Sequence, residues 1–347
     1  MTRTFQILGS NGFEGAKLQI NPLKQFVMIS GLDYHDFWSF NSYAEKHKAK
    51  LLKTKNAKED FIFYMVDILV GKIRKIEIIG SKSAVETTTK FDIVDKSNYV
   101  NHYFESNGKK IISKTDIYKL IEQIGIDNPN TLVEVNVFSH AYWNGPILVN
   151  SSKGIDDHDM RISDVTGSII NAKNFKDAFH VNGIFKIWGC SFPRDTNALF
   201  SKIRKNKNYK SSGVIADTIK FMYPKNHFTF QMGTEPEVNL TTEINDILKT
   251  SFKVSDSIEL TFLQIKKIAC YNYINVYAAI LSNKFDIKCQ SALPATYAEI
   301  TPDFHISSLT LENVKFYETH LNVQLGELKY GVYDKKTVDD LTKILNS

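Results

Sequence analysis

Short apolar runs separated by glycine and asparagine recur along the chain. Residues 61–67, 73–79, 132–138 and 184–188 are each rich in β-branched and aromatic residues, which is typical of strands. Ahead of the third run, residues 117–124 carry apolar side chains three to four positions apart, a period that predicts a helix. Because strand and helix alternate with short connections, the pattern predicts an α/β fold with a mostly parallel central sheet covered on both faces.

The N-terminal region has a different pattern. Apolar runs at 5–8 and 16–20 flank a Gly-Ser-Asn-Gly turn, and a third run lies at 25–29, which together predict β-hairpins. Residues 35–55 come closer to a helical period. We therefore predict three parts: a small β-rich N-terminal extension over residues 1–57, an α/β core over 58–300, and a C-terminal segment over 301–347 packed on that core.

Later segments add helices and one strand. Apolar spacing predicts one long helix over 255–283 and a short helix over 337–345. Residues 286–291 predict a last strand whose end adds a loop at the same sheet edge. The polar stretch 81–108, with alternating threonine and lysine, predicts an edge strand and loops.

Composition indicates an ordinary folded protein. The chain has 347 residues, with 43% hydrophobic and 23% charged residues, near globular averages. Its net charge of +5 comes from scattered lysines, whereas nucleic-acid binding favours basic residues clustered on one face and interleaved with aromatics. The densest basic stretch, 202–210, is interpreted as an exposed helix end and loop, with a phosphate-binding site as the alternative. The sequence carries no strong nucleic-acid signal.

The cysteines and the N-terminal sequence indicate in which cellular compartment the protein is expected. Cys190, Cys270 and Cys289 are odd in number and lack Cys-x-x-Cys spacing, which argues against a disulfide framework and a structural zinc site. The N-terminus lacks the apolar segment of a secretory signal, and no apolar run approaches the ~18 residues needed to span a bilayer. We expect a cytoplasmic protein without a membrane span, with signal-independent export left open.

Two of the predicted strands end in residues suited to nucleophilic chemistry. The third apolar run is followed by Ser139-His140 and the fourth by Gly189-Cys190. If the two strands are neighbours in a parallel sheet, both functional side chains emerge at one edge, where α/β proteins place their sites. A thiol nucleophile needs a nearby base and donors for the oxyanion formed on attack. The pattern therefore predicts a Cys190/His140 dyad.

A strand ending in Ser-His and a small residue, followed fifty residues later by a strand ending in small-Cys, resembles the caspase-like cysteine peptidases. This group holds caspases, gingipains, legumains and bacterial relatives, some written as Ser-His-Gly with a downstream Gly-Cys. The resemblance covers about 61–294 in strand order, and its specific residues are Ser139, His140, Gly189 and Cys190. It implies a three-layer sandwich and peptide-bond hydrolysis after a defined side chain.

The resemblance also implies individual roles. His140 would be the general acid and base, Cys190 the nucleophile, and the N–H groups of Ala141 and Cys190 the oxyanion donors. The chain departs from the family pattern where Ala141 replaces the usual glycine, and where Gly189-Cys190-Ser191 stands in place of Gln-Ala-Cys-x-Gly.

The loop after His140 offers a candidate pocket. Tyr142, Trp143, Asn144 and Gly145 are interpreted as substrate-binding residues of the pocket wall, with simple loop packing as the alternative.

The acidic stretch at 156–159 holds three aspartates and one histidine. Consecutive residues cannot all face one cation, so a solvated loop is favoured and no metal is expected. Asp159 or Asp164 could orient His140.

The leading hypothesis is a bacterial cysteine peptidase, a thiol-dependent hydrolase acting on a peptide or protein. The alternative is a non-catalytic caspase-like relative that binds a ligand or partner near Tyr142, Trp143 and Asn144, for example in an interbacterial toxin or phage-defence system. The chain lacks GxSxG, GxGxxG and GxxxxGK[ST] motifs, which removes the common serine-hydrolase, dinucleotide and P-loop classes. No cofactor is implied, and the oligomeric state is not indicated.

Overall fold

A large sheet forms the centre of the protein. The computed structural model describes residues 22–151, 157–191, 200, 219–222, 240–252 and 257–347. In these ranges eight strands form one sheet in the order β18-β15-β12-β9-β1-β4-β5-β6. The strands are β1 (Leu23–Ser30), β4 (Asp60–Asp67), β5 (Lys72–Ile78), β6 (Val85–Lys90), β9 (Leu132–Phe138), β12 (Phe179–Trp188), β15 (Lys288–Ser291) and β18 (Gly331–Tyr333).

The sheet is mixed but mostly parallel, as predicted. Its five middle strands, β4, β1, β9, β12 and β15, run parallel to one another. β18 is antiparallel at one edge, and the hairpin of β5 and β6 extends the other edge. β9 and β12 pair directly up to the partners Phe138 and Trp188, so the expectation that these two strands are neighbours is confirmed.

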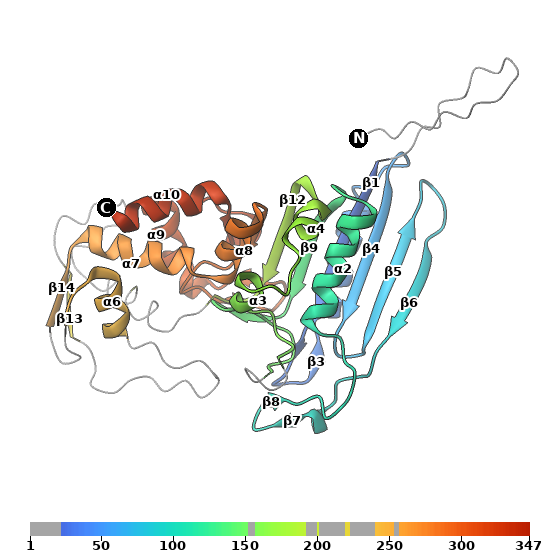
Figure 1. The fold of residues 1–347 in the computed structure, drawn as a ribbon, viewed down its shortest axis with the longest axis horizontal. Coiled ribbons are helices and arrows are strands. Elements are labelled where there is room, and N and C mark those ends of the chain that lie inside the picture. Colours follow the sequence, from blue (N-terminus) through green and yellow to red (C-terminus); the bar gives the residue numbers. More distant parts are fainter. Residues whose placement is uncertain (1–21, 152–156, 192–199, 201–218, 223–239, 253–256) are drawn as a thin grey trace, which may run out of the picture.

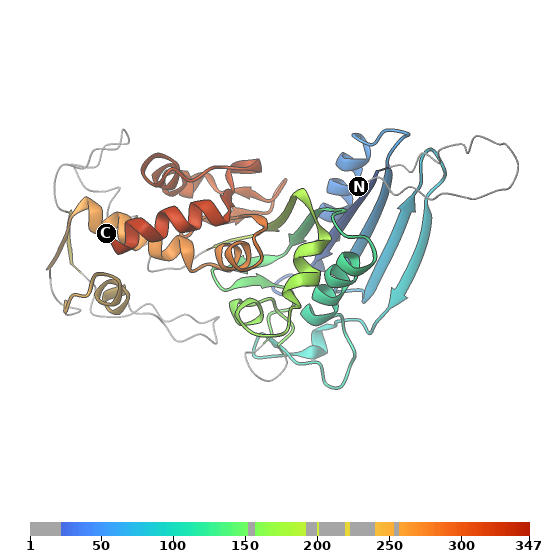
Figure 2. The same cartoon turned by 45° about the horizontal axis from the view of Figure 1, so that its top comes forward.

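Helices lie on both faces of this sheet, an arrangement compatible with three layers. α2 and α4 pack together on one face and α4 contacts α8, while α1 contacts the opposite face at β1, β4 and β9 (Figure 2). α7, α9 and α10 gather beyond the β15–β18 edge (Figure 1). The helices are α1 (Asn41–Leu52), α2 (Lys114–Asp127), α3 (Ile162–Thr166), α4 (Ala172–Ala178), α6 (Leu240–Leu248), α7 (Phe262–Ile274), α8 (Tyr277–Phe285), α9 (Leu311–Leu321) and α10 (Lys335–Asn346).

Short elements connect these layers. The short strands are β2 (Leu32–Asp33), β3 (Trp38–Ser39), β7 (Tyr99–Val100), β8 (Tyr103–Phe104), β10 (His140–Tyr142), β11 (Gly145–Ile147), β13 (Ile219–Met222), β14 (Ser257–Leu260), β16 (Ala298–Glu299) and β17 (His305–Ile306). Single turns of 3₁₀ helix lie at η1 (Lys96–Asn98), η2 (Ser308–Thr310) and η3 (Glu327–Lys329).

The predicted helix ahead of β9 is confirmed as α2. It begins after Ser113, whose side chain accepts a hydrogen bond from the backbone N–H of Asp116, while the Asp116 carboxylate accepts one from the N–H of Ser113. This reciprocal capping satisfies two otherwise unpaired donors of the first turn. Ile117 and Ile121 then face the core and are fully buried.

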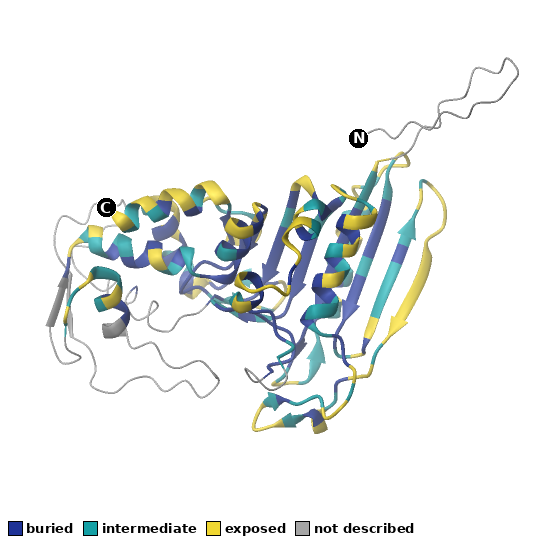
Figure 3. Ribbon diagram, in the orientation of Figure 1, coloured by how far each residue is buried: buried dark blue, intermediate teal, exposed yellow. Residues whose placement is uncertain are grey.

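The N-terminal region contributes to the same sheet. The hairpin prediction is wrong for the run at 25–29, which is β1 and lies between β4 and β9, parallel to both. Its residues Phe26 to Ser30 are buried, whereas β6 at the sheet edge is exposed along its length, as the edge-strand prediction required (Figure 3). The predicted runs at 5–8 and 16–20 and the basic stretch 202–210 lie outside the described residues.

The single helix predicted over 255–283 is wrong. Its described part forms β14, α7 and α8, with a break at Asn275 and Val276. Val276 has an extended backbone, and the N–H of Tyr277 donates to the carbonyl of Trp143 at 2.8 Å. A tertiary hydrogen bond thus replaces the intrahelical one that the continuous apolar period implies.

A charged network on the α1 face joins three parts of the fold. Lys186 is buried in β12, and its Nζ lies 3.0 Å from Glu134 Oε1 in β9 and 2.7 Å from Glu327 Oε1 in η3. His47 of α1 reaches Glu134 Oε2 at 2.8 Å. Burial alone would raise the pKa of Glu134, but the hydrogen bond from His47 and the charge of Lys186 lower it to about 2.

We predict that Glu134→Gln lowers the free energy of unfolding by about 3 kcal/mol at pH 7, because it leaves the Lys186 ammonium buried with less compensation. Since the folded pKa of about 2 lies below the ordinary 4.5, the stabilisation is complete above pH 4.5 and is lost as the pH falls toward 2. Urea unfolding of both proteins should therefore show a difference that narrows below pH 4.5.

The control is Glu312→Gln, which removes an exposed partner of Lys315 on α9. That change should cost less than about 0.5 kcal/mol. Equal effects of the two substitutions would contradict the prediction.

Candidate active site

The ends of β9 and β12 touch each other at the carboxyl edge of the sheet. The N–H of Ser139 donates to the carbonyl of Trp188 at 3.4 Å. A Cβ on Gly189 would lie 2.7 Å from the Ser139 oxygen and 2.8 Å from the Ala141 Cβ, closer than real contacts. Position 189 therefore has no room for a side chain, and the residues that follow the two strands, His140 and Cys190, emerge at one edge as predicted.

His140 is held in an aromatic pocket. It begins β10, which pairs with β11 in a short antiparallel hairpin. Its ring lies 5.0 Å from the ring of Tyr34 and 5.5 Å from that of Phe40. The Nε2 atom is buried and lies 3.5 Å from Asp33 Oδ1, within ion-pair distance, but it has no hydrogen-bond partner among the described residues. The ring is thus packed among aromatic rings with Nε2 beside a carboxylate.

Asp33 is a site residue that the sequence interpretation missed. It follows β1, and its Oδ1 accepts the backbone N–H groups of His35 at 2.8 Å and Asp36 at 3.2 Å. Burial alone would raise the pKa of Asp33, but these two N–H groups and the neighbouring His140 outweigh it and lower the pKa. Asp33 is therefore an ionised carboxylate beside the imidazole.

Asp159 and Asp164, the earlier candidates for orienting His140, have other partners. Asp159 is 2% exposed and accepts backbone N–H groups of the segment 148–151, while Asp164 pairs with Lys114 at 2.8 Å. The solvated-loop interpretation of 156–159 is wrong for Asp159, because a buried carboxylate here organises the backbone after β11.

The charge state of His140 follows from its burial. Burial lowers the pKa of His140, and the negative charge of Asp33 opposes that shift without cancelling it. The imidazole is therefore neutral at pH 7 and able to accept a proton.

Cys190 is partly buried next to the β16–β17 hairpin. Its Sγ accepts the backbone N–H of Ala298 at 3.4 Å. Burial raises the pKa of the Cys190 thiol, and the Ala298 N–H opposes this shift only in part. The resting group is thus a protonated thiol, and nucleophilic attack would require a base to remove its proton.

His140 and Cys190 share no hydrogen bond within the described part of the chain, because Sγ contacts Ala298 and Nε2 faces Asp33. Catalytic hydrogen bonds often tighten only when substrate binds. The Tyr34 ring lies 5.0 Å from the His140 ring. The pKa of Tyr34 is raised by burial and by nearby carboxylates, Asp159 before Asp33.

The residues after His140 form the β10–β11 hairpin. Ala141 is buried, and a Cβ on Gly189 would lie 3.2 Å from its backbone nitrogen, so the N–H of Ala141 and the backbone of residue 189 are adjacent. Asn144 accepts the N–H of Ile162, and Gly145 packs against the carbonyl of Met160, where a Cβ would lie at 2.3 Å. The loop-packing alternative therefore describes Asn144 and Gly145.

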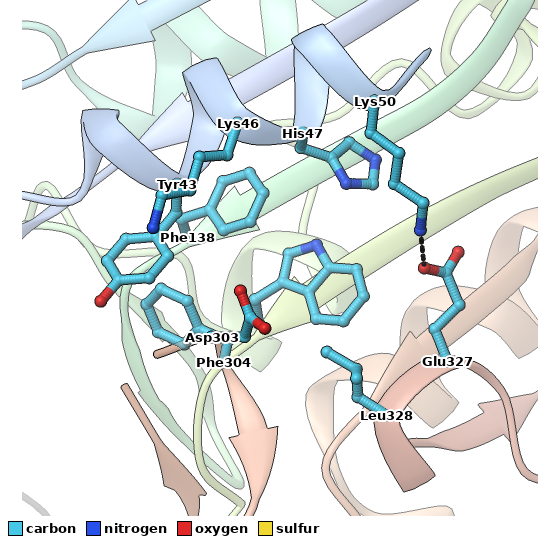
Figure 4. Close-up of a pocket in the computed structure, with 10 residues that line it drawn as sticks. Tyr43, Lys46, His47, Lys50, Phe138, Asp303, Phe304, Glu327 and Leu328 are labelled. Carbon is cyan, nitrogen blue, oxygen red and sulfur yellow. Dashed lines mark hydrogen bonds and ion pairs between the residues drawn. The ribbon is translucent and has the colours of Figure 1, made fainter. Parts of the chain in front are cut away.

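A cleft of about 480 Å³ opens on the α1 side of the same edge (Figure 4). Its lining comes from α1, the ends of β9 and β12, and the segments around β17 and η3. Tyr142, Trp143, Asn144 and Gly145 are not among the described residues that line it. The lining residues are Tyr43, Lys46, His47, Lys50, Phe138, Trp188, Asp303, Phe304, Glu327 and Leu328.

Two further findings concern metals and membranes. In the described ranges, no three histidine, cysteine or carboxylate side chains gather as metal ligands. Within those ranges, none of the helices combines the length and apolar composition needed to cross a membrane.

No protein-family model, curated protein or solved structure matches this chain.

We predict that iodoacetamide at pH 7.5 modifies Cys190 before the other cysteines, but more slowly than free cysteine because its raised pKa leaves little thiolate. Cys270 and Cys289 are fully buried, and burial raises the pKa of Cys270 to about 12 and that of Cys289 further. Mass spectrometry after timed pulses measures the order. All three should react alike in guanidinium chloride, and equal labelling of the folded protein would contradict the assignment.

Proposed function

We propose that the chain is a caspase-like cysteine hydrolase that cleaves a peptide or related acyl bond. The observation that carries this proposal is the contact between β9 and β12, which delivers His140 and Cys190 to one sheet edge over the glycine at position 189. The parallel middle strands and the helices on both faces agree with the fold that the resemblance implies. The free thiols are consistent with the proposed cytoplasmic location.

The proposed reaction begins with an uncharged pair. Neutral His140 accepts the proton of the Cys190 thiol as Sγ attacks the substrate carbonyl carbon. The carbon–nitrogen bond then breaks, the amine leaves with the proton that His140 returns, and a thioester to Cys190 remains. Water, deprotonated by His140, hydrolyses the thioester and regenerates the thiol.

Two sets of groups would support the charges that develop. The N–H groups of Ala141 and Cys190 are the candidate donors to the oxyanion of each tetrahedral intermediate. The Asp33 carboxylate would stabilise the imidazolium that forms on His140. Asp33 is a positioning residue in this scheme, because it acts through His140.

A second candidate function is binding without catalysis. It is favoured by the hydrogen bond that Cys190 Sγ accepts from Ala298 and by the lack of one to His140 among the described residues. In that case the edge would hold a ligand or a protein partner, and the thiol would stay protonated.

We predict that Cys190→Ala and His140→Ala each lower kcat/KM by about a thousand-fold or more, because the two groups act as one unit. A fluorogenic peptide library that varies the residue before the cleaved bond provides the assay. Cys270→Ala is the matched control, since it removes a buried thiol on α7 outside the site. Thermal unfolding should show that the variants are folded. Cleavage that survives Cys190→Ala would exclude the cysteine mechanism.

We predict that Asp33→Asn lowers kcat/KM by roughly 10- to 100-fold and moves the acid limb of its pH profile to lower pH. The acid limb reports protonation of the neutral His140 imidazole. Because the charge of Asp33 raises the pKa of His140, removing that charge lowers the pKa of His140. Asp33→Glu should restore part of the rate. The exposed neighbour Asp36 gives the control Asp36→Asn, and an unmoved limb in Asp33→Asn would show that Asp33 has no electrostatic role.

A further inference from the structure

The strand β6 forms an open edge of the sheet, at the end opposite β18 (Figure 1). Within the described residues no strand pairs with its outer side, and all of its residues are exposed (Figure 3). Natural edge strands avoid pairing through proline, a bulge, a covering segment or well-placed charges. β6 has no proline, and its register with β5 runs without a break up to Lys90. Whether β6 can pair therefore depends on where its charges lie.

The backbone of β6 alternates between two directions. The N–H of Phe91 donates to the carbonyl of Gly71 at 2.8 Å, in continuation of the register between β5 and β6. In an antiparallel ladder, the N–H and C=O of one residue point to the same side, and that side alternates along the strand. The backbone groups of the odd-numbered residues of β6 therefore face β5, whereas those of Glu86, Thr88 and Lys90 face outward. These three residues offer donors and acceptors to a further strand.

The two charged residues of β6 lie toward its ends and on one face of the sheet. Glu86 is approached by Arg74 of β5 at 3.6 Å. Lys90 lies directly opposite Lys72 of β5, and neither of these lysines has an ion-pair partner among the described residues. Like charges placed opposite each other destabilise a sheet. A carboxylate on the outer side of Lys90 would offset this repulsion.

A second copy of β6 carries a carboxylate at the required position. When two copies pair antiparallel with Thr88 opposite Thr88, Glu86 of each copy lies opposite Lys90 of the other. Every such pair joins residues whose backbone groups face outward, so each pair can exchange two hydrogen bonds. Opposite charges facing each other across the strands stabilise this register. A shift of the register by two residues would place Glu86 opposite Thr88 or opposite the like-charged Asp92.

We propose that the protein forms a two-fold symmetric homodimer in which two copies of β6 pair antiparallel, with Thr88 at the axis. The two sheets then become one continuous sheet. A two-fold interface uses the same patch on both copies, and this strand is complementary to itself. The pairing also places Val85, which is 59% exposed, opposite Phe91 of the other copy. The dimer does not depend on the proposed hydrolase function, because β6 lies away from the β9–β12 edge.

One strand edge is smaller than a standard interface of roughly 1,600 Å², so we expect a dissociation constant on the order of 10–100 µM. Sedimentation velocity of the full chain from about 1 to 500 µM covers this range. Lys90→Glu should weaken the dimer at least ten-fold, because it places Glu86 opposite a second carboxylate. Adding Glu86→Lys should restore the dissociation constant to within about three-fold, since the charges are then exchanged between the strands.

The control Lys119→Glu makes the same charge change on the exposed side of α2 and should leave association unchanged. A further variant, Thr88→Pro, removes an outward N–H and no hydrogen bond within one copy. Thermal unfolding should show that this variant is folded, and it should remain monomeric. Amide hydrogen exchange measured by NMR should show protection of Glu86, Thr88 and Lys90 that rises with protein concentration, whereas that of Thr87 should stay constant.

A wild-type protein that remains monomeric up to about 500 µM would overturn the proposal. A dimer that survives Thr88→Pro would also overturn it, because its interface would lie away from β6. Failure of the exchanged pair Glu86→Lys and Lys90→Glu to restore association would exclude the register centred on Thr88.

Discussion

The contact between the ends of β9 and β12 depends on the missing side chain at position 189. A single Cβ there would press on the Ser139 carbonyl and the Ala141 methyl group, so the two strands would have to separate before reaching His140 and Cys190. The position of two neighbouring groups depends on this contact. The β10–β11 hairpin starts from one strand end, and the thiol after the other reaches β16. The close approach of the backbone at Gly189 to Ser139 and Ala141 therefore sets the geometry of the site.

Burial gives the site its electrostatic character. The same low-polarity surroundings raise the pKa of the Cys190 thiol and lower that of the His140 imidazole, so both are uncharged at rest. Asp33 is the opposite case, because backbone N–H groups keep its carboxylate ionised despite burial. The negative charge of Asp33 thus lies beside a neutral imidazole. It lowers the free-energy cost of protonating His140.

Local pattern predicted β9, α2 and β12 because each is a continuous apolar run or period. It predicted a strand at 25–29 but expected a hairpin there, because the partners of β1 in β9 lie about a hundred residues away in the sequence. Asp33 was missed for that reason, since it follows β1. The break before Tyr277 and the burial of Asp159 likewise depend on backbone partners remote in sequence, at Trp143 and at Leu148.

The segment from Ala298 to Tyr330 gives the molecule a particular order of assembly during synthesis. Ala298 contacts Cys190, Glu327 pairs with Lys186, and the Tyr330 ring packs on Trp188 at 5.2 Å. A ribosome delivers these residues more than a hundred positions after the strand they complete. In the nascent chain, Lys186 and Cys190 therefore lack these contacts. They gain them only when the segment from Ala298 to Tyr330 packs against β12.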